Sequence, residues 1–509
     1  MKSQITRRDF LKLMGLLPLT AMAPRMSRSF SPQEKGQNVI IVVFDAFSAA
    51  NISLYGYQRD TTPNLARLAN RAIVYHNHFA GGNFTPPGTA SLLTGTYPWT
   101  HRAFGLDKNK VEESFVDKNI FSVFQNRYCL AYTHNPVANT LLTQFGSKLS
   151  NHIPLGKYFL ANDDFIHDLF SVDEDIATVS WVRAIKRKED RFSYSLFLSH
   201  LYEYYREEKI TDLLSKFPNG IPHIAGDNYF LLEDAVDWSV NELVDLPQPF
   251  IGYFHFMPPH RPYLTHKDFY GRFAKDGFFP VQKPLDPFLG QEHDMMNFIN
   301  KRRTDYDEFI LYVDREFGRF MDKMDEIGLL DHTWIVLTSD HGEMFERGIF
   351  GHLTPTLYQP VIHIPLLIFE PGRTTRTDIY SNTSAVDILP TLLHVTGQKQ
   401  VTWSEGVVLP PFSQKAPDLE RNLYVVQAKT NAQYAPLTVA TTALIKGQYK
   451  LMYFFGYGEL NAGEERIELY DLVNDPEELY DLSSSKRELT AELLRDLKET
   501  LSAVNEPYL

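Results

Sequence analysis

The stretch Asn38-Val-Ile-Ile-Val-Val-Phe44, followed by Asp45, decides the fold that the sequence predicts. An uncharged run rich in β-branched residues is typical of a central parallel strand that is buried on both faces of a sheet. Open α/β sheets bind their ligands at the carboxyl ends of their strands. The stretch therefore predicts the fold class and places one carboxylate, that of Asp45, at the expected site.

Two further runs of this kind lie at 249–256 and 333–338, and helical patterns separate them, including a long helix expected over 305–327. Strands that alternate with helices indicate a doubly wound α/β domain with a mostly parallel sheet. The first of these runs leads into His260 in a proline-rich loop. The second is followed directly by Asp340 and His341.

The length of 509 residues allows one large domain and a smaller one. We expect a catalytic domain over 38–400, in which the aromatic helical patterns of 105–245 include an insertion that shapes substrate access. Short strands and a terminal amphipathic helix over 401–509 indicate a small α+β C-terminal subdomain.

The first 23 residues are expected to be a signal peptide, and 24–37 a polar linker. Arg7 and Arg8 precede a short apolar run and the small-residue pattern Ala21-Met-Ala23, which resembles a twin-arginine export signal. The run is shorter than the roughly 20 residues that a membrane span needs. An amphipathic helix or membrane anchor is the alternative. The signal implies the twin-arginine export machinery as a partner and a periplasmic or extracellular bacterial protein.

The net charge limits which kinds of binding partner are expected. With 50 Lys and Arg against 63 Asp and Glu, the net charge is −13, which argues against nucleic acid or an anionic membrane as the main partner. An anionic substrate would need a local positive charge, and a metal ion can provide it. The single cysteine, Cys129, allows neither an internal disulfide nor a thiolate metal cluster.

A strand expected over 73–79 leads to the segment 83–95, in which Thr85 precedes two prolines and a short apolar run. Proline favours the first turn of a helix and Thr is a favoured N-cap, so we expect Thr85 to cap a helix. Free N–H groups at that end stabilise anions, including an alkoxide or the oxygens of a phosphate or sulfate ester. Thr85 is therefore a candidate nucleophile, and an ordinary helix cap is the alternative.

The sheet topology is expected to bring Asp45, Thr85, Asp340 and His341 to the same edge. Two carboxylates, an imidazole and a hydroxyl can bind one divalent cation of the zinc or manganese type, with calcium as a further possibility. A metal bound to Thr85 would lower the pKa of its hydroxyl and attract the ester oxygens. In the simpler alternative, Asp45 caps a helix, and Asp340 and His341 close a turn.

A series of segments spans most of the chain: 38–45, 54–65, 85–95, 97–98, 255–260, 306–314, 338–343, 387–392, 468–472 and 474–477. In their sequence and order they resemble the sulfatase branch of the alkaline phosphatase superfamily. The resemblance implies the family's α/β fold, a divalent metal and chemistry at an ester. It also implies that His260 and His352 bind the non-bridging oxygens or protonate the leaving group, with structural histidines as the alternative.

The sequence departs from the sulfatase pattern at the nucleophile. Where sulfatases convert a cysteine or serine to formylglycine, this chain has Thr85, which cannot be converted, and Thr89 stands where that motif has arginine. Ala46 replaces the second aspartate of the usual pair, and no lysine stands beside His352. The remaining metal site resembles that of the phosphoethanolamine and glycerol-phosphate transferases.

The threonine favours phosphate over sulfate. A formylglycine hydrate expels sulfate by breaking its own C–O bond, whereas a threonyl sulfate would need water to attack a crowded sulfur. A threonyl phosphate can transfer its phosphoryl group to water or an alcohol by in-line attack. We therefore expect a hydrolase or transferase of phosphate esters, including phosphodiesters, that forms a covalent intermediate on Thr85. Glycan or lipid-headgroup esters are candidate substrates.

Two alternatives stay open. One is a sulfuric ester hydrolase that does not use formylglycine. The other is a catalytically silent protein that uses the site to bind glycans or headgroups.

Overall fold

The structure is a computed structural model. It describes residues 37–106, 110–158, 204, 208, 210–224, 228–287, 289, 294–414, 416, 418–460 and 465–509. These described residues form one compact unit. The predicted signal peptide and almost all of the predicted linker lie outside the described residues, so both stay predictions.

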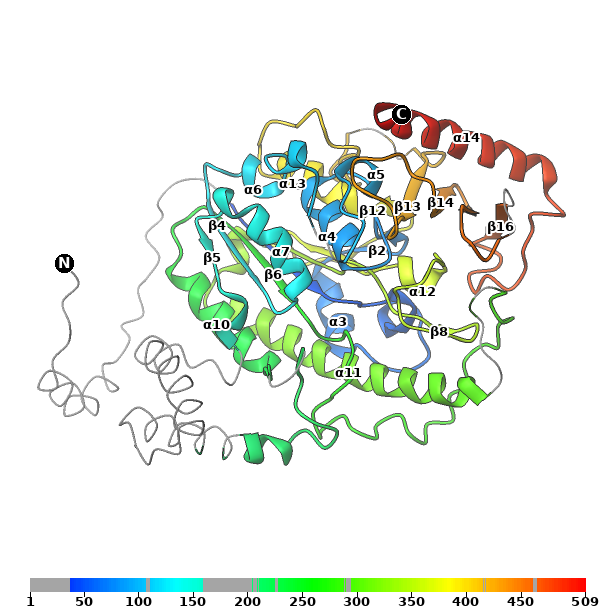
Figure 1. The fold of residues 1–509 in the computed structure, drawn as a ribbon. Helices are drawn as coiled ribbons and strands as arrows, with labels where there is room; N and C mark the ends of the chain where they lie inside the picture. Colours follow the sequence, from blue (N-terminus) through cyan, green and yellow to red (C-terminus); the bar gives the residue numbers. More distant parts are fainter. Residues whose placement is uncertain are drawn as a thin grey trace, which may run out of the picture. The chain divides into compact units, whose positions relative to one another are not determined.

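An eight-stranded sheet lies at the centre of this unit (Figure 1). Its order is β11 (Thr377–Ile379), β2 (Ile73–Tyr75), β10 (Leu366–Phe369), β7 (Thr333–Thr338), β1 (Asn38–Phe44), β6 (Phe250–Phe256), β4 (Tyr128–Thr133) and β5 (Asn151–His152). β10 is antiparallel to both neighbours, and every other pair in this sheet is parallel. The predicted doubly wound, mostly parallel sheet is confirmed.

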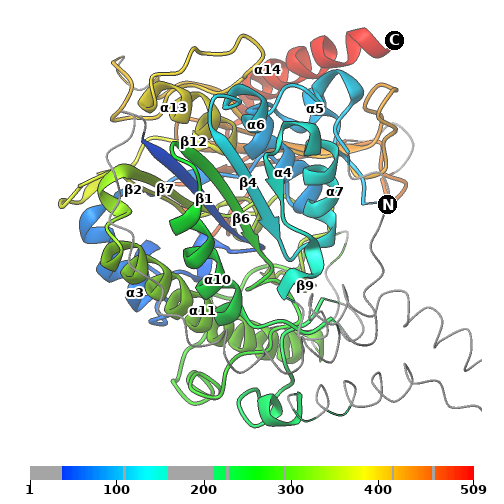
Figure 2. The same ribbon diagram turned by 90° about the vertical axis from the view of Figure 1, so that its left-hand side faces the viewer.

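Helices cover both faces of this sheet (Figure 2). One layer contains α3 (Pro63–Leu68), α10 (Leu232–Asp245) and α11 (Asp294–Glu326), and the other contains α4 (Thr85–Thr94), α6 (Ile120–Val123), α7 (Pro136–Gln144) and α13 (Ile388–Val395). Alternate residues of β1 pack into the two layers: Val42 contributes to the first core and Val43 to the second. This two-sided burial explains the uninterrupted apolar run in the sequence.

A second sheet follows near the C-terminus. Its strands are β13 (Leu423–Gln427), β14 (Ala440–Lys446), β15 (Tyr449–Phe455) and β16 (Glu465–Asp471), all antiparallel, followed by α14 (Arg487–Asn505). One face packs against α14, and the other packs against Ile349, Leu357 and Val361 in the segment after β7. The small C-terminal α+β part is thus present and supports that segment. The domain boundary at 400 stays a prediction.

Besides 3₁₀ helices, the described chain also contains the short elements α5 (Pro98–His101), α12 (Gln359–Ile362), β3 (His78–Phe79), β8 (Phe345–Glu346), β9 (Ile349–Phe350) and β12 (Thr383–Ser384). Within the described residues, none of the helices combines the length and the apolar character needed to span a membrane.

The predicted strand over 73–79 is wrong as a single element. β2 ends at Tyr75, and β3 pairs with β12 in a separate two-stranded sheet. The polar side chains of His76 and Asn77 interrupt the strand, because they bind Asp378 and the backbone carbonyl of Tyr380. The segment that leads to Thr85 therefore comes from a side sheet.

Candidate active site

The four predicted ligands lie together where β1 and β7 end and α4 begins. The Nε2 atom of His341 lies 3.4 Å from Asp45 Oδ1, 3.5 Å from Asp340 Oδ2 and 3.5 Å from Thr85 Oγ1. All four residues are buried, and Thr85 is the most accessible at 5% exposed. The structure therefore brings together the residues that the sequence grouped.

These separations fit the ligands of one cation. Donor atoms about 2.0–2.2 Å from a tetrahedral metal lie about 3.3–3.6 Å from one another. Asp45 Oδ1 and Asp340 Oδ2 are buried oxygens without a hydrogen-bond partner in the described part of the chain. Burying two such groups is costly unless a positive charge pairs with them. The residues present thus fit a divalent metal, and Asp45, Asp340 and His341 form a compact group of possible ligands.

Protein donors hold the second oxygen of each carboxylate. Asp340 Oδ1 accepts hydrogen bonds from the backbone N–H groups of Ala46, at 3.3 Å, and His341, at 3.0 Å. Asp45 Oδ2 accepts a hydrogen bond from Asn135 Nδ2 and lies 3.4 Å from His255 Nε2. Each carboxylate therefore has one oxygen fixed by hydrogen bonds and one oxygen that faces His341.

Ala46 stands at the position where the sulfatase pattern has its second aspartate. It has a φ of 58°, in the left-handed region, and its N–H donates to Asp340 Oδ1. The backbone at this position thus contributes a hydrogen bond rather than a further carboxylate.

A hydrogen bond at Nδ1 orients the ring of His341 so that Nε2 is the nitrogen that could bind a metal. Its Nδ1 lies 2.9 Å from the carbonyl oxygen of Gly342, which assigns the ring hydrogen to Nδ1 and the lone pair to Nε2. Burial lowers the pKa of His341, but the charges of Asp340 and Asp45 outweigh this effect and raise it.

The two carboxyl groups differ in acidity. Burial favours the neutral form of Asp45, but the positive charge of His260 and the contacts with His255 and His341 hold its pKa below the usual range. Burial and the negative charge of Asp45 raise the pKa of Asp340. A cation between the two groups would relieve this repulsion.

Thr85 is the first residue of α4, and Phe84 is its N-cap. The predicted capping role of Thr85 is therefore wrong: Pro86 and Pro87 carry no N–H to bond, and the first available N–H, that of Gly88, donates to the carbonyl oxygen of Phe84 at 3.1 Å. For the same reason this helix start offers an anion fewer amide donors than the sequence argument assumed. The hydroxyl instead lies within 3.3 Å of Asn135 Nδ2 and faces His341.

Gly88 brings α4 close enough for this contact. A Cβ atom at this position would lie 2.1 Å from the backbone oxygen of Asp340. Only glycine permits this approach, so it fixes the distance between the start of the helix and the end of β7.

The two predicted catalytic histidines border the site. His352 is buried, its ring centroid lies 4.3 Å from that of His341, and its Nδ1 lies 3.0 Å from Glu343 Oε1. Burial lowers the pKa of His352 to about 4, despite the opposing charge of Glu343. His260 is partly exposed, its ring centroid lies 5.0 Å from that of His352, and its Nδ1 donates to the Arg261 carbonyl at 2.7 Å.

Sequence reasoning missed two site residues, Asn135 and His255. Asn135 follows β4 and caps α7, because its Oδ1 accepts from the N–H groups of Val137, at 2.7 Å, and Ala138, at 3.1 Å. An Asn before a proline is a helix-start signal that could have placed it at the end of a strand. For His255, within the predicted strand 249–256, no comparable local signal exists.

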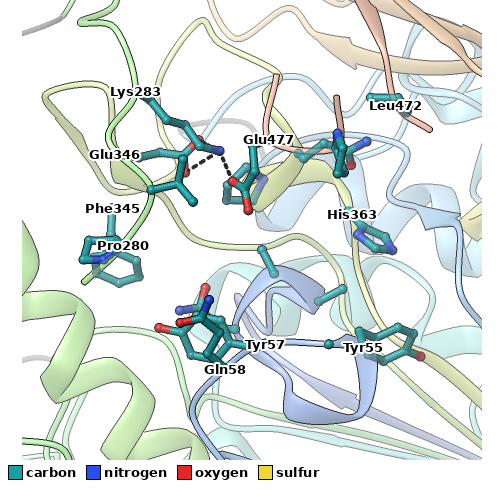
Figure 3. Close-up of a pocket in the computed structure, with 18 of the residues that line it drawn as sticks. Tyr55, Tyr57, Gln58, Pro280, Lys283, Phe345, Glu346, His363, Leu472 and Glu477 are labelled. Atoms are coloured by element: carbon teal, nitrogen blue, oxygen red, sulfur yellow. Dashed lines mark hydrogen bonds and ion pairs between the residues drawn. The ribbon is translucent and has the colours of Figure 1, made fainter. Parts of the chain in front are cut away.

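A separate cavity of about 410 Å³ lies between the loops after β1 and β7 and the C-terminal sheet (Figure 3). Lys283, at its wall, pairs with Glu346 at 2.9 Å and with Glu477 at 2.7 Å. None of the four predicted ligands is among its lining residues, although Glu343, which holds His352, is. The cavity adjoins the candidate site without containing its chemistry.

Comparison with known proteins gives consistent matches. The sulfatase family model matches residues 37–398, and the model of the C-terminal region of N-sulphoglucosamine sulphohydrolase matches 346–506. The choline-sulfatase of Rhizobium meliloti is 23% identical over 86% of this chain and 81% of its own. The N-acetylgalactosamine-6-O-sulfatase of Bacteroides thetaiotaomicron is 22% identical over 97% of this chain and 98% of its own.

The fold is also that of solved structures. The phosphonate monoester hydrolase of Agrobacterium radiobacter aligns over 93% of this chain and 96% of its own, with a TM-score of 0.63 and 18% identity. At this identity the similarity shows the fold alone.

Proposed function

Because the chain belongs to the sulfatase family, we propose that it is an exported metal-dependent hydrolase or transferase of phosphate esters with Thr85 as its nucleophile. The observation that carries the proposal is the position of the Thr85 hydroxyl, 3.5 Å from His341 Nε2, the atom that also lies 3.4 Å from Asp45 Oδ1 and 3.5 Å from Asp340 Oδ2. An ordinary helix cap would not place the hydroxyl there.

Asp45, Thr85, Asp340 and His341 would hold one divalent cation. Zinc or manganese suits this set better than calcium, because an imidazole is among the ligands and calcium prefers oxygen. Such a cation would lower the pKa of the Thr85 hydroxyl and offset the charge of the ester oxygens.

Three further side chains have roles in the proposal. Asn135 Nδ2 donates toward Thr85 Oγ1 and would stabilise the negative charge on that oxygen. His352 is neutral at neutral pH and its Nδ1 is bound to Glu343, so its Nε2 can accept a proton. His260 reaches solvent and is the candidate that protonates the leaving oxygen.

The reaction would proceed in two displacements. In the first, Thr85 Oγ1 gives its proton to His352 and forms a bond to phosphorus, the bond from phosphorus to the leaving oxygen breaks, and the leaving oxygen takes a proton from His260. In the second, water or an acceptor alcohol gives its proton to His260 and attacks phosphorus, while the bond from phosphorus to Thr85 Oγ1 breaks and that oxygen takes its proton back from His352. With water the products are an alcohol and a phosphate.

Hydrolysis of sulfate esters is the second candidate, and the sulfatase relatives favour it. The threonine argues against it, because no formylglycine can form at Thr85 and water would have to attack the sulfur of a threonyl sulfate. For either reaction, an ester of a glycan or a lipid headgroup is the proposed substrate. Export by the twin-arginine machinery is proposed from Arg7 and Arg8.

A substrate panel tests the proposal. The purified protein, loaded with zinc or manganese, is assayed with an aryl phosphate monoester, a diaryl phosphate and an aryl sulfate. We expect turnover of a phosphate ester that Thr85→Ala abolishes while metal content is retained. Faster turnover of the sulfate would favour the second candidate, and no turnover of any ester by the metal-loaded protein would favour a silent binding protein.

A further inference from the structure

We infer that His255 is a positioning residue for the metal carboxylates: backed by Tyr253, it holds Asp45 and Asp340 in place and sets the affinity of the site for its cation. The inference rests on the proposed function, because it takes these carboxylates as metal ligands. Nothing in the sequence pattern or the family comparison assigns this role.

The position of His255 supports the inference. It lies on β6, which pairs with β1 on one side and β4 on the other, and its register partners are Val43 and Thr133. The residue is fully buried. Its Nε2 lies 3.4 Å from Asp45 Oδ2 and 3.7 Å from Asp340 Oδ2, so one ring atom faces both carboxylates.

Tyr253 determines which ring nitrogen carries the hydrogen. Its hydroxyl lies 3.1 Å from His255 Nδ1, and both side chains lie on the same face of β6, two residues apart. Burial raises the pKa of Tyr253 well above its usual value, so the phenol keeps its proton and can donate it to Nδ1. Nε2 then carries the ring hydrogen, and Asp45 Oδ2 at 3.4 Å and Asp340 Oδ2 at 3.7 Å are the anionic oxygens beside it; the contact is electrostatic, because Nε2 makes no hydrogen bond within the described residues. The opposite tautomer would point a lone pair at these oxygens, which is electrostatically unfavourable.

In this tautomer His255 is not a metal ligand, because Nε2 has no free lone pair. It acts through the carboxylates in two ways. Its N–H offsets part of the repulsion between two buried negative groups, and it restrains the rotation of Asp45 so that Oδ1 faces His341. Partners that orient metal ligands in this manner commonly change metal affinity by roughly 10–100-fold when they are removed.

Zinc affinity and a cobalt spectrum test the role without relying on activity. We expect His255→Phe to weaken zinc binding, measured by chelator competition, by roughly 10–100-fold. The visible spectrum of the cobalt-loaded variant should keep the wild-type band pattern, since the ligands are unchanged. His255→Gln retains an N–H donor on a flexible chain and should recover part of the affinity. Tyr253→Phe should cause a smaller loss of zinc affinity, because it removes only the hydroxyl that favours the tautomer of His255 with the hydrogen on Nε2.

His134→Phe is the matched control. His134 is fully buried and its ring stacks on Phe230 at 4.3 Å, and among the described residues it pairs with neither carboxylate. This substitution should leave zinc affinity unchanged.

Three outcomes would overturn the inference or its premise. Wild-type affinity in both His255→Phe and Tyr253→Phe would contradict the positioning role. A cobalt spectrum that changes its coordination bands in His255→Phe would identify His255 as a direct ligand. Failure of the wild-type protein to bind zinc, manganese or cobalt would instead contradict the proposed function, so the two failures are distinguishable.

Discussion

The Nε2 atom of His341 and the Oδ1 atom of Asp45 lie 3.4 Å apart at the ends of two adjacent parallel strands, β7 and β1. Both side chains are fully buried, and the second carboxylate, Asp340, lies equally close to the imidazole. Such a cluster is stable when a cation neutralises it, which gives a prediction about Asp45.

Removing a residue that only orients a metal ligand weakens metal binding by roughly 10–100-fold. Asp45→Asn should weaken zinc binding by more than this, because it removes a charged ligand. The rise in unfolding temperature on adding zinc should therefore be smaller for the variant than for wild type, because the variant binds zinc more weakly. Thermal unfolding with and without zinc measures this effect.

Asp378→Asn is the control for this substitution. Asp378 also pairs with a histidine, His76, at 2.7 Å, but its side chain is 30% exposed and remote from the proposed metal ligands. It should not change zinc affinity. A zinc-induced stabilisation of Asp45→Asn equal to that of wild type would contradict Asp45 as a ligand.

Asn135 should affect catalysis and stability separately. Its Nδ2 donates to Asp45 Oδ2 and toward Thr85 Oγ1, and its Oδ1 caps α7. Asn135→Ala loses both functions and should lower kcat by roughly 10²–10³-fold, as for other donors to a reacting oxygen. It should also lower the free energy of unfolding by about 1 kcal/mol.

Asn135→Ser separates the two effects, because serine is a good N-cap but its hydroxyl is too short to replace the amide donor. It should have nearly wild-type stability and the same low kcat as Asn135→Ala. A serine variant with full activity would show that the amide is needed only for the helix.

Acid should destabilise the fold through its buried histidines. Burial lowers the pKa of His134 from 6.5 to about 3, and in the described chain neither ring nitrogen has a hydrogen-bond partner. The unfolded chain therefore binds a proton below pH 6.5 that the folded chain does not. The contribution of His134 to the free energy of unfolding is fully present above pH 6.5. It decreases by about 1.4 kcal/mol per pH unit as the pH falls from 6.5 toward 3.

His134→Phe removes this contribution, so urea unfolding of the variant should lose about 2 kcal/mol less than wild type between pH 6.5 and 5. His332→Gln, at an exposed histidine, should follow the wild-type curve. Parallel curves for wild type and His134→Phe would contradict the assignment of His134 as neutral and buried.

A buried ion pair should couple the C-terminal sheet to the segment after His352. Lys450 on β15 pairs with Glu478, both side chains are fully buried, and Lys450 Nζ also donates to the Leu357 carbonyl at 2.7 Å. Lys450→Met leaves Glu478 buried without its partner and should cost about 3–5 kcal/mol of the free energy of unfolding.

The double variant Lys450→Met/Glu478→Gln should recover part of this loss, because no unpaired charge remains. Chemical unfolding of the single and double variants measures the free energy of unfolding that is recovered. A single variant as stable as wild type would show that the pair does not support this segment.

Much of the fold was predictable from local sequence. The runs at 38–44 and 333–338 correspond to β1 and β7 with the same bounds, because a strand buried on both faces is apolar at every position. Asp45, Asp340 and His341 follow these strands directly, so their convergence could be predicted from the parallel order alone.

The remaining site depends on contacts that local sequence does not encode. His255 faces the carboxylates because of the register of β6 against β1, and Asn135 does so because β4 lies beside β6. The predicted cap at Thr85 failed because Pro86 and Pro87 have no N–H, and the predicted strand at 73–79 failed because β3 finds its partner in β12.

The most direct test of the central claim is mass spectrometry of the zinc-loaded protein, quenched in acid after brief exposure to an aryl phosphate ester. Trypsin cleavage after Arg71 and Arg102 isolates the peptide 72–102, and fragment ions distinguish Thr85 from Thr89 and Thr94. We predict a phosphoryl adduct on Thr85 that is absent from Thr85→Ala. Continued turnover by Thr85→Ala, or an adduct on another residue, would contradict the proposed mechanism.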